Sequence, residues 1–447
     1  MRSITAKLHA ILIRLIILVL ILFMVSIGLR IVTHSILVGR LGMDNAFTRL
    51  VLWDETKALR DDREVASAAP GTSALRTAGL TGTLGDIHRR YTTMTRRVTN
   101  KLDSYANQQL MFRRPIVEAA NRYEKLINWN LAGYSEYNNV IDLGGGYLTT
   151  FMNWIDVWGN VEAVQEFNEY LDAQDIPMLF VQLPSKIPRQ DTVVNNVVDF
   201  YNDNADRLVG WLSDSGVNTL DLRDDAEQLD LDYRLLFYNT DHHWRAETGL
   251  WAAGAIGGEL NRSFGFTIDP ALFDPASYTF ERYEKAYLGS LGKKVTLARA
   301  TPDDFNLIYP KFDVNLTMKI PAINLEATGG FDIIFDYSQL DIQDLYQREL
   351  YGMYLRSATT QHGFIQLENK LPQGDARKVL ILGDSFNYAL VPYLGLGIDR
   401  MDYVDLRHYT GSLRDLVDAG GYEMVILAYS SLFQVEYSSG LSMYDFR

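Results

Sequence analysis

One stretch, Val379-Leu-Ile-Leu-Gly-Asp-Ser-Phe386, constrains the fold more than any other part of the chain. Its four apolar residues, followed by a glycine, are typical of a strand that is buried on both faces of a parallel sheet. Gly383 allows a tight turn, and a helix is expected over 386–393. The pattern therefore predicts an α/β fold in which Ser385 lies at the carboxyl edge of the sheet.

Ser385 has two interpretations. At a strand-to-helix turn its hydroxyl is exposed, and main-chain N–H groups at the helix start can hold an oxyanion, which suits a nucleophile. Alternatively, Gly-Asp-Ser is only a turn followed by a helix cap. A second signal elsewhere in the chain is needed to favour the nucleophile.

A nucleophilic serine needs a base, and histidines are scarce. Only seven occur in 447 residues, and two are adjacent in Tyr238-Asn-Thr-Asp-His-His-Trp244. Asp241 and His243 can supply a base and the carboxylate that orients it, with His242 as the competitor for the base. The alternatives are ordinary turn residues or two metal ligands. A metal is disfavoured because the chain has no cysteine and no third histidine nearby at a usual spacing. We predict no metal and no other cofactor.

The Asp-His-His-Trp block, followed far downstream by Gly-Asp-Ser-Phe, resembles the DHHW proteins, a bacterial group within the SGNH hydrolase-like superfamily. Further matching pieces are Phe180-Val-Gln-Leu-Pro-Ser-Lys186, Val404-Asp-Leu-Arg-His-Tyr409 and Val425-Ile-Leu-Ala-Tyr429. The resemblance covers roughly residues 140–447, with a poorly matched middle. In typical SGNH enzymes the serine block comes first, whereas in this group, as here, it comes last.

The resemblance implies a flavodoxin-like α/β fold and a serine site that O-acetylates alginate or another exopolysaccharide. It favours His243 over His242 as the base, so we predict that Ser385, His243 and Asp241 act as nucleophile, base and orienting carboxylate. It also implies a membrane-bound O-acyltransferase as the partner that brings the acyl group across the bilayer.

Other residues are candidates for contacts with the oxyanion or the substrate. Arg407, Tyr429 and Lys186 each follow a predicted strand and are expected at the same sheet edge. His242 and Trp244 lie in the histidine block. Each has a plain structural alternative, such as an ion pair or a cap, and the usual glycine and asparagine oxyanion blocks of SGNH enzymes are not evident.

The amino-terminal segment predicts a membrane anchor. Ala10–Leu29 is apolar apart from Arg14, Ser26 and Gly28, and about 20 such residues cross a bilayer. The positive charges of Arg2, Lys7 and Arg14 precede it, so the amino end is expected in the cytoplasm. A cleaved signal peptide is the alternative, but an Ala-x-Ala-like site is lacking. We expect a single-pass protein of the cell membrane with residues 40–447 outside.

Composition excludes one class of partner. The net charge is −14, and nucleic-acid binding needs a basic face, so no nucleic-acid partner is expected. The absence of cysteine excludes disulfides and thiol chemistry, and 47% hydrophobic residues are ample for a core.

The chain is predicted to contain three parts. These are an anchor over 1–39, a juxtamembrane helical region over 40–135, and an α/β domain over 136–447 with a β-containing insertion over about 264–376. A helical stripe over 84–128 packs on its own domain or pairs with a partner. The insertion either forms a wall of the substrate groove or only covers the sheet edge.

Helices alternating with short apolar strands predict a parallel sheet with helices on both faces. A turn or hairpin is expected over 142–148. The expected helices span 161–174, 193–213, 246–262 and 412–417. The expected strands span 178–182, 218–222, 379–382, 403–406 and 424–428.

Three functions fit these observations. The first is transfer of an acyl group through Ser385 to a hydroxyl of an extracellular polysaccharide. The second is a carbohydrate esterase that removes acyl groups. The third is a catalytically silent scaffold that binds polysaccharide or the membrane partner.

Overall fold

The computed structural model describes residues 140–189, 193–194, 197–357, 362–371, 375–430 and 443–447, together with Glu118 and Arg122. The predicted anchor over Ala10–Leu29 and the helical stripe over 84–128 lie outside the described residues. Within the described ranges, each helix is too short or too polar to cross a membrane.

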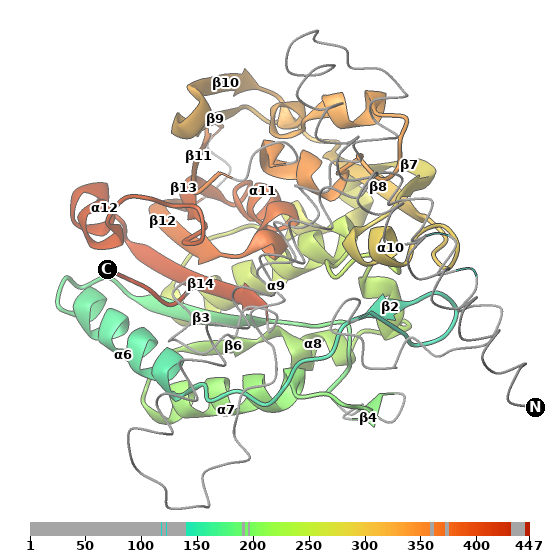
Figure 1. Cartoon of the computed structure of the whole chain (residues 1–447). Helices are drawn as coiled ribbons and strands as arrows, with labels where there is room; N and C mark the ends of the chain where they lie inside the picture. The colour runs from blue at the N-terminus through green and yellow to red at the C-terminus, as the bar shows by residue number, and fades with distance from the viewer. Residues whose placement is uncertain are drawn as a thin grey trace, which may run out of the picture. The chain divides into compact units, whose positions relative to one another are not determined.

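An eight-stranded mixed sheet, in the order β10-β9-β11-β13-β12-β14-β3-β6, forms the centre of the fold (Figure 1). Five neighbouring strands are parallel: β13 (Ile398–Val404), β12 (Asp375–Gly383), β14 (Met424–Ser430), β3 (Met178–Leu183) and β6 (Thr219–Asp221). Three strands at one edge are antiparallel: β11 (Phe364–Asn369), β9 (Leu316–Ile320) and β10 (Leu325–Gly329).

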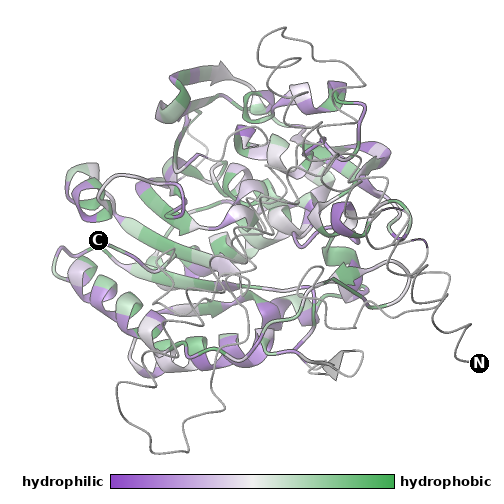
Figure 2. Cartoon of the chain, viewed as in Figure 1, coloured by the Kyte–Doolittle hydropathy of each residue, from purple (hydrophilic) through white to green (hydrophobic). Residues whose placement is uncertain are grey.

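The five strands predicted from the sequence are parallel, as expected, and three antiparallel strands from the region 264–376 extend the sheet, which is therefore mixed rather than purely parallel. Burial explains the difference. Every residue of β3 and β14 is buried, as expected for strands covered on both faces, whereas β11 alternates between buried and half-buried residues. Alternation is typical of an antiparallel strand with one solvated face. Figure 2 shows hydrophobic residues along the central strands and mixed hydropathy on the outer helices.

Helices cover both faces of the sheet. On one face lie α6 (Trp158–Asp172), α7 (Tyr201–Asp214) and α12 (Leu413–Gly420). On the other lie α9 (Ala246–Phe264) and α11 (Val391–Leu394). The Tyr170 hydroxyl of α6 donates to the carbonyl of Arg414 in α12, and α9 packs on α11. This division is the one that right-handed crossovers between the five parallel strands require.

The remaining elements are short. The strands are β1 (Ile141–Asp142), β2 (Leu148–Thr149), β4 (Val193–Val194), β5 (Val197–Val198), β7 (Tyr278–Tyr287) and β8 (Asp303–Pro310). The α-helices are α8 (Leu222–Glu227) and α10 (Ser290–Val295). The 3₁₀ helices are η3 (Tyr233–Leu236), η4 (Pro270–Phe273), η5 (Pro275–Ser277), η6 (Pro321–Ile323), η7 (Phe331–Ile334), η8 (Tyr337–Asp341), η9 (Tyr351–Arg356) and η10 (Ser385–Ala389).

Two helix predictions are corrected. The helix expected over 193–213 begins only at Tyr201, because the preceding valines pair as β4 and β5 and the Asp199 carboxylate accepts the Tyr201 N–H. The helix expected over 386–393 is split into η10 and α11. Pro392 follows the break and cannot supply the N–H that a continuous helix needs.

The region 264–376 has the expected β content, but it does not stand apart from the sheet. β7 and β8 pair as an antiparallel hairpin, while β9, β10 and β11 extend the central sheet beyond β13. The hairpin predicted over 142–148 is formed by β1 and β2.

Candidate active site

Ser385 lies directly after β12, at the carboxyl edge of the sheet, and begins η10. The cap of η10 is Asp384, whose Oδ1 accepts the Phe386 N–H at 2.9 Å. Its Oδ2 accepts the N–H and the hydroxyl of Ser430 at 2.8 and 2.7 Å. The turn is thus tied to the end of β14. Because Asp384 supplies the cap, the Ser385 hydroxyl is available for another partner.

The histidine block forms a closed turn between η3 and α9. Main-chain hydrogen bonds link the Tyr238 N–H to the His243 carbonyl at 3.3 Å and the Arg245 N–H to the Leu236 carbonyl at 2.8 Å. The indole N–H of Trp244 donates to the Phe386 carbonyl at 3.0 Å. This last bond joins the turn to the 3₁₀ helix that carries Ser385.

The two blocks meet in one hydrogen-bonded chain. His243 Nε2 lies 2.7 Å from the Ser385 Oγ, and His243 Nδ1 lies 2.5 Å from Asp241 Oδ1. Asp241 Oδ1 also accepts the His243 N–H at 3.0 Å. His242 points elsewhere, with its Nδ1 3.0 Å from the Ser290 hydroxyl. The structure therefore brings Asp241, His243 and Ser385 together in the order that general-base activation of a serine requires.

Ionisation favours the same arrangement. Burial opposes the charge on Asp241, but the imidazoles of His242 and His243 and the hydrogen bonds from His243 outweigh it and hold the pKa of this carboxyl well below its usual range. Burial, aided by repulsion from His243, lowers the pKa of His242 well below its ordinary value. Asp241 is thus a carboxylate at pH 7.

The insertion supplies two further contacts that the sequence does not reveal. The Ser290 N–H, at the start of α10, donates to Asp241 Oδ2 at 2.6 Å. The Tyr351 ring, in η9, stacks on His243 with centroids 4.0 Å apart and planes at 17°. The Tyr351 hydroxyl also donates to the Phe386 carbonyl at 2.9 Å. The insertion therefore contacts and positions both the Asp241 carboxylate and the His243 imidazole, in addition to extending the sheet.

Lys186 contacts the main chain of the histidine block. Its buried ammonium donates to the carbonyls of Tyr238 at 2.6 Å, Asp241 at 2.7 Å and Asn239 at 3.2 Å. Burial lowers the pKa of Lys186 to about 7. All three acceptors are main-chain carbonyls, so Lys186 stabilises the conformation of the turn that carries Asp241 and His243.

The other candidate contacts have structural partners. The Arg407 guanidinium pairs with the Asp405 carboxylate at 2.6 Å and is buried. The Tyr429 hydroxyl is buried and donates to the Met443 carbonyl at 2.9 Å. Trp244 is fully buried and bonded to η10, as described above. Burial raises the pKa of Asp384, the cap of η10, and this effect is larger than that of the positive charge of Arg407, which lowers the pKa of the same carboxyl.

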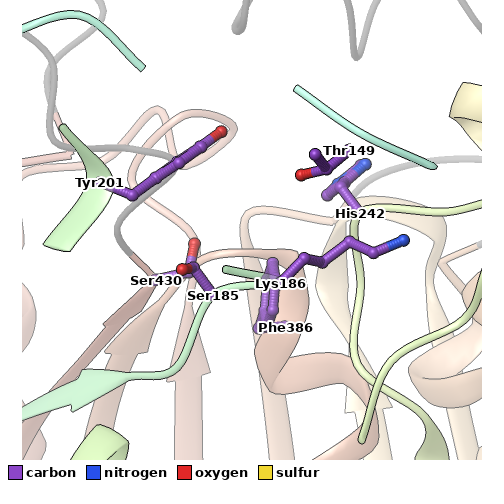
Figure 3. A pocket seen from close by; sticks show the side chains of 7 residues that line it. All are labelled: Thr149, Ser185, Lys186, Tyr201, His242, Phe386 and Ser430. Atoms are coloured by element: carbon purple, nitrogen blue, oxygen red, sulfur yellow. The ribbon is translucent and has the colours of Figure 1, made fainter. Parts of the chain in front are cut away.

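A pocket opens beside this chain of contacts. It is lined by Thr149, Ser185, Lys186, Tyr201, His242, Phe386 and Ser430 (Figure 3). In Figure 3 the Tyr201 ring and the Thr149 side chain lie on opposite sides of the space. The cavity has room for about one water molecule, and its lining residues His242 and Phe386 directly adjoin His243 and Ser385.

Asp241, His242 and His243 also place their ligand atoms within 4.8 Å of one another, as a metal site would. However, the Nδ1 atoms of both histidines already have hydrogen-bond partners in Ser290 and Asp241. A metal bound through these Nδ1 atoms would have to displace these bonds. The expectation of a metal-independent site stays a prediction.

Comparison with known proteins bears on this geometry. Residues 157–304 match the model of the SGNH hydrolase-like domain of the acetyltransferase AlgX. A search of curated protein sequences finds no match. The resemblance to SGNH hydrolase-like proteins expected from the sequence is thereby confirmed.

Solved structures share the fold at low identity. Bacillus cereus PatB1 with a sulfonyl adduct is 16% identical, with a TM-score of 0.54 over 69% of this chain and 99% of that chain. A second structure of Bacillus cereus PatB1 is 18% identical, with a TM-score of 0.53 over the same shares. A DHHW family protein from Eubacterium siraeum is 16% identical, with a TM-score of 0.52 over 70% of this chain and 97% of that chain.

Proposed function

We propose that this protein, which carries an SGNH hydrolase-like domain, is a serine-dependent O-acyltransferase that modifies hydroxyl groups of an extracytoplasmic polysaccharide. One observation carries the proposal. Asp241, His243 and Ser385 form a continuous hydrogen-bonded chain at the carboxyl edge of the sheet, although about 140 residues separate the two sequence blocks.

In the first half of the reaction, the Ser385 Oγ attacks the carbonyl carbon of an acetyl or other acyl ester. His243 Nε2, 2.7 Å away, takes the hydroxyl proton, and the Asp241 carboxylate stabilises the resulting imidazolium through Nδ1. The main-chain N–H of Ser385, at the start of η10, is the donor we assign to the tetrahedral oxyanion. The leaving alcohol takes the proton from His243, and the acyl group remains on Ser385.

In the second half, a glycan hydroxyl in the pocket attacks the acyl-serine ester. His243 now takes the proton of that hydroxyl and returns it to Ser385, which restores the free enzyme. If water attacks instead, the same residues act as an esterase. The acceptor is thus the sole chemical difference between the leading proposal and the esterase alternative.

The relatives support this choice of reaction class. The matching family model is described as that of an acetyltransferase. PatB1 has been solved with a sulfonyl adduct, so a sulfonyl fluoride is a suitable probe for a reactive hydroxyl in this chain as well.

The remaining parts of the proposal concern location and partner. The apolar run Ala10–Leu29 with its preceding positive charges supports a single-pass anchor with the catalytic domain outside the cell membrane. The family resemblance supports a membrane-bound O-acyltransferase as the source of the acyl group. Protease treatment of wall-free cells tests the location, because an external domain is digested before lysis and an internal one only after it.

The direct test of the reaction is incubation of the purified protein with an acetyl ester, with and without a glycan acceptor, followed by mass spectrometry of the products. A transferase yields acetylated glycan, whereas an esterase yields acetate in both mixtures. The variants Ser385→Ala and His243→Ala should each lose well over 10³-fold, and Asp241→Ala should lose less than either, on the order of 10⁴-fold. His242→Ala tests the competing base, and its loss should be smaller because the His242 Nδ1 faces the Ser290 hydroxyl rather than Ser385. A scaffold would leave all variants fully active in polysaccharide acylation in cells.

A further inference from the structure

Two tryptophans on the surface of the domain have no part in its core. Trp154 is 50% exposed and Trp158 is 45% exposed. Trp154 lies in the extended segment that follows β2, and Trp158 begins α6. Large aromatic side chains at neighbouring surface positions are typical of a ligand-binding or partner-binding surface.

Both indole rings are held in place by their neighbours. The Arg207 guanidinium lies 4.6 Å from the centroid of the Trp154 ring. Trp211 packs edge-on against Trp158 with centroids 5.3 Å apart, and the Trp158 indole N–H donates to the Glu162 carboxylate at 2.8 Å. Because the rings are already ordered, a ligand that stacks on them loses little affinity to ordering the side chains.

These aromatic residues are connected to the pocket beside Ser385 through α7. Tyr201 lines the pocket, and Asn204, Arg207 and Trp211 follow it at spacings of three, three and four, so all four side chains share one face of the helix. Ten residues of helix correspond to about 15 Å. Figure 1 shows α6 and α7 lying side by side along this surface.

A second row of residues runs along the same path. The segment from Thr149, which lines the pocket, to Trp158 is fixed to the start of α7. The Ile155 N–H donates to the Asn204 Oδ1 at 3.2 Å, and Arg207 donates to the Ile155 carbonyl at 2.9 Å. These bonds fix the position of the segment that carries the two tryptophans relative to α7 and the pocket.

We propose that Trp154 and Trp158 form a stacking site for sugar rings of an extended neutral glycan that is long enough to reach from these tryptophans to Ser385. The flat C–H faces of a pyranose match an exposed indole, and the nearby carboxylates of Asp156 and Glu162 can accept hydrogen bonds from sugar hydroxyls. These two carboxylates and the net charge of −14 disfavour an acidic polymer. The inference rests on the proposed function and extends it by naming the class of acceptor.

The test separates glycan binding from catalysis. Full-length protein in detergent, in a Ser385→Ala background, is titrated with linear glucose and N-acetylglucosamine oligomers from disaccharide to octasaccharide. Affinity should rise with chain length. The double variant Trp154→Ala/Trp158→Ala should lose at least about tenfold in affinity for the long oligomers, equivalent to about 1.4 kcal/mol. Phe280→Ala, which removes an equally exposed aromatic from the β7–β8 hairpin, should bind as the parent does.

A second measurement uses the same tryptophan substitutions in protein that retains Ser385. A sulfonyl fluoride should label Ser385 in these variants at the same rate as in the protein with both tryptophans. Unchanged labelling with weakened glycan binding supports the stacking site whether or not the transferase proposal survives. Glycan binding that is equal in the double variant, or absent from the parent for every oligomer, overturns the inference. So does binding that depends on the tryptophans but selects only alginate oligomers or phospholipid vesicles.

Discussion

Replacing Gly289 with alanine should disable the candidate active site without unfolding the domain. Gly289 precedes α10, and a Cβ placed on it would collide with the Cβ and the Oδ2 of Asp241. One of the two segments must move. Either movement disturbs the bond from the Ser290 N–H to Asp241 Oδ2, which is 2.6 Å long, and the alignment of Asp241 with His243.

The expected size of the effect is bounded on both sides. Loss of one hydrogen bond to a charged group costs about 1.5–3 kcal/mol, or roughly 10- to 150-fold in rate. Complete loss of the orienting carboxylate in a serine triad costs on the order of 10⁴-fold in kcat. We therefore expect kcat for hydrolysis of a small acetyl ester to fall between these limits in the variant Gly289→Ala.

The matched control is Gly258→Ala. Gly258 lies in α9, and a Cβ there would meet no other atom within 4 Å. This variant should keep full activity and gain roughly 0.5–1 kcal/mol in stability from the better helix former. If Gly289→Ala retains more than half of the parental kcat with a normal melting transition, the account of Asp241 as the orienting group is wrong.

Three further predictions concern the surroundings of the site. Tyr351→Leu should lower kcat about 5- to 100-fold, since it removes both the stack on His243 and the bond to the Phe386 carbonyl, whereas Tyr351→Phe, which keeps the stack, should lose only a few-fold. Burial lowers the pKa of Lys186 to about 7, so above this pH the unfolded chain binds a proton that the folded protein lacks. Urea titrations should therefore show wild type gaining stability relative to Lys186→Met from pH 7 to 10, by at most about 1.4 kcal/mol per pH unit. Burial raises the pKa of Asp199 to about 7, so the sign is reversed, and wild type should lose stability relative to Asp199→Asn between pH 4 and 7. If the stability of wild type and of Lys186→Met, or of wild type and of Asp199→Asn, changed in parallel with pH, the shifted pKa assigned to that residue would be wrong.

Much of the central sheet could be predicted because its signals are local. A continuous apolar run bounded by turn residues identified β3, β12 and β14 to within a few residues. The positions of Ser385 and His243 followed from turns directly after such runs or before a helix. Their pairing as base and nucleophile was expected from the resemblance to the DHHW proteins, because the histidine block does not follow a strand of the sheet.

The parts that escaped prediction depend on contacts between distant segments. Nothing in the sequence around Ser290 or Tyr351 marks them as neighbours of Asp241 and His243, since the insertion packs against the site only in three dimensions. The antiparallel strands β9, β10 and β11 are only five or six residues long and share no common pattern, since β9 is mostly buried, β10 has no buried residue and β11 alternates. The late start of α7 reflects the local pairing of β4 with β5, whose valines have low helical propensity.

The most direct test of the central claim is the mass of the Ser385 peptide during turnover. The protein is mixed with an excess of acetyl ester, quenched in acid within seconds and digested, and the peptide is compared with that from Ser385→Ala. The account predicts that one acetyl group accumulates on Ser385 and disappears when a glycan acceptor is added. Sustained turnover with an unmodified Ser385, or with acetyl on another residue in its place, would contradict it.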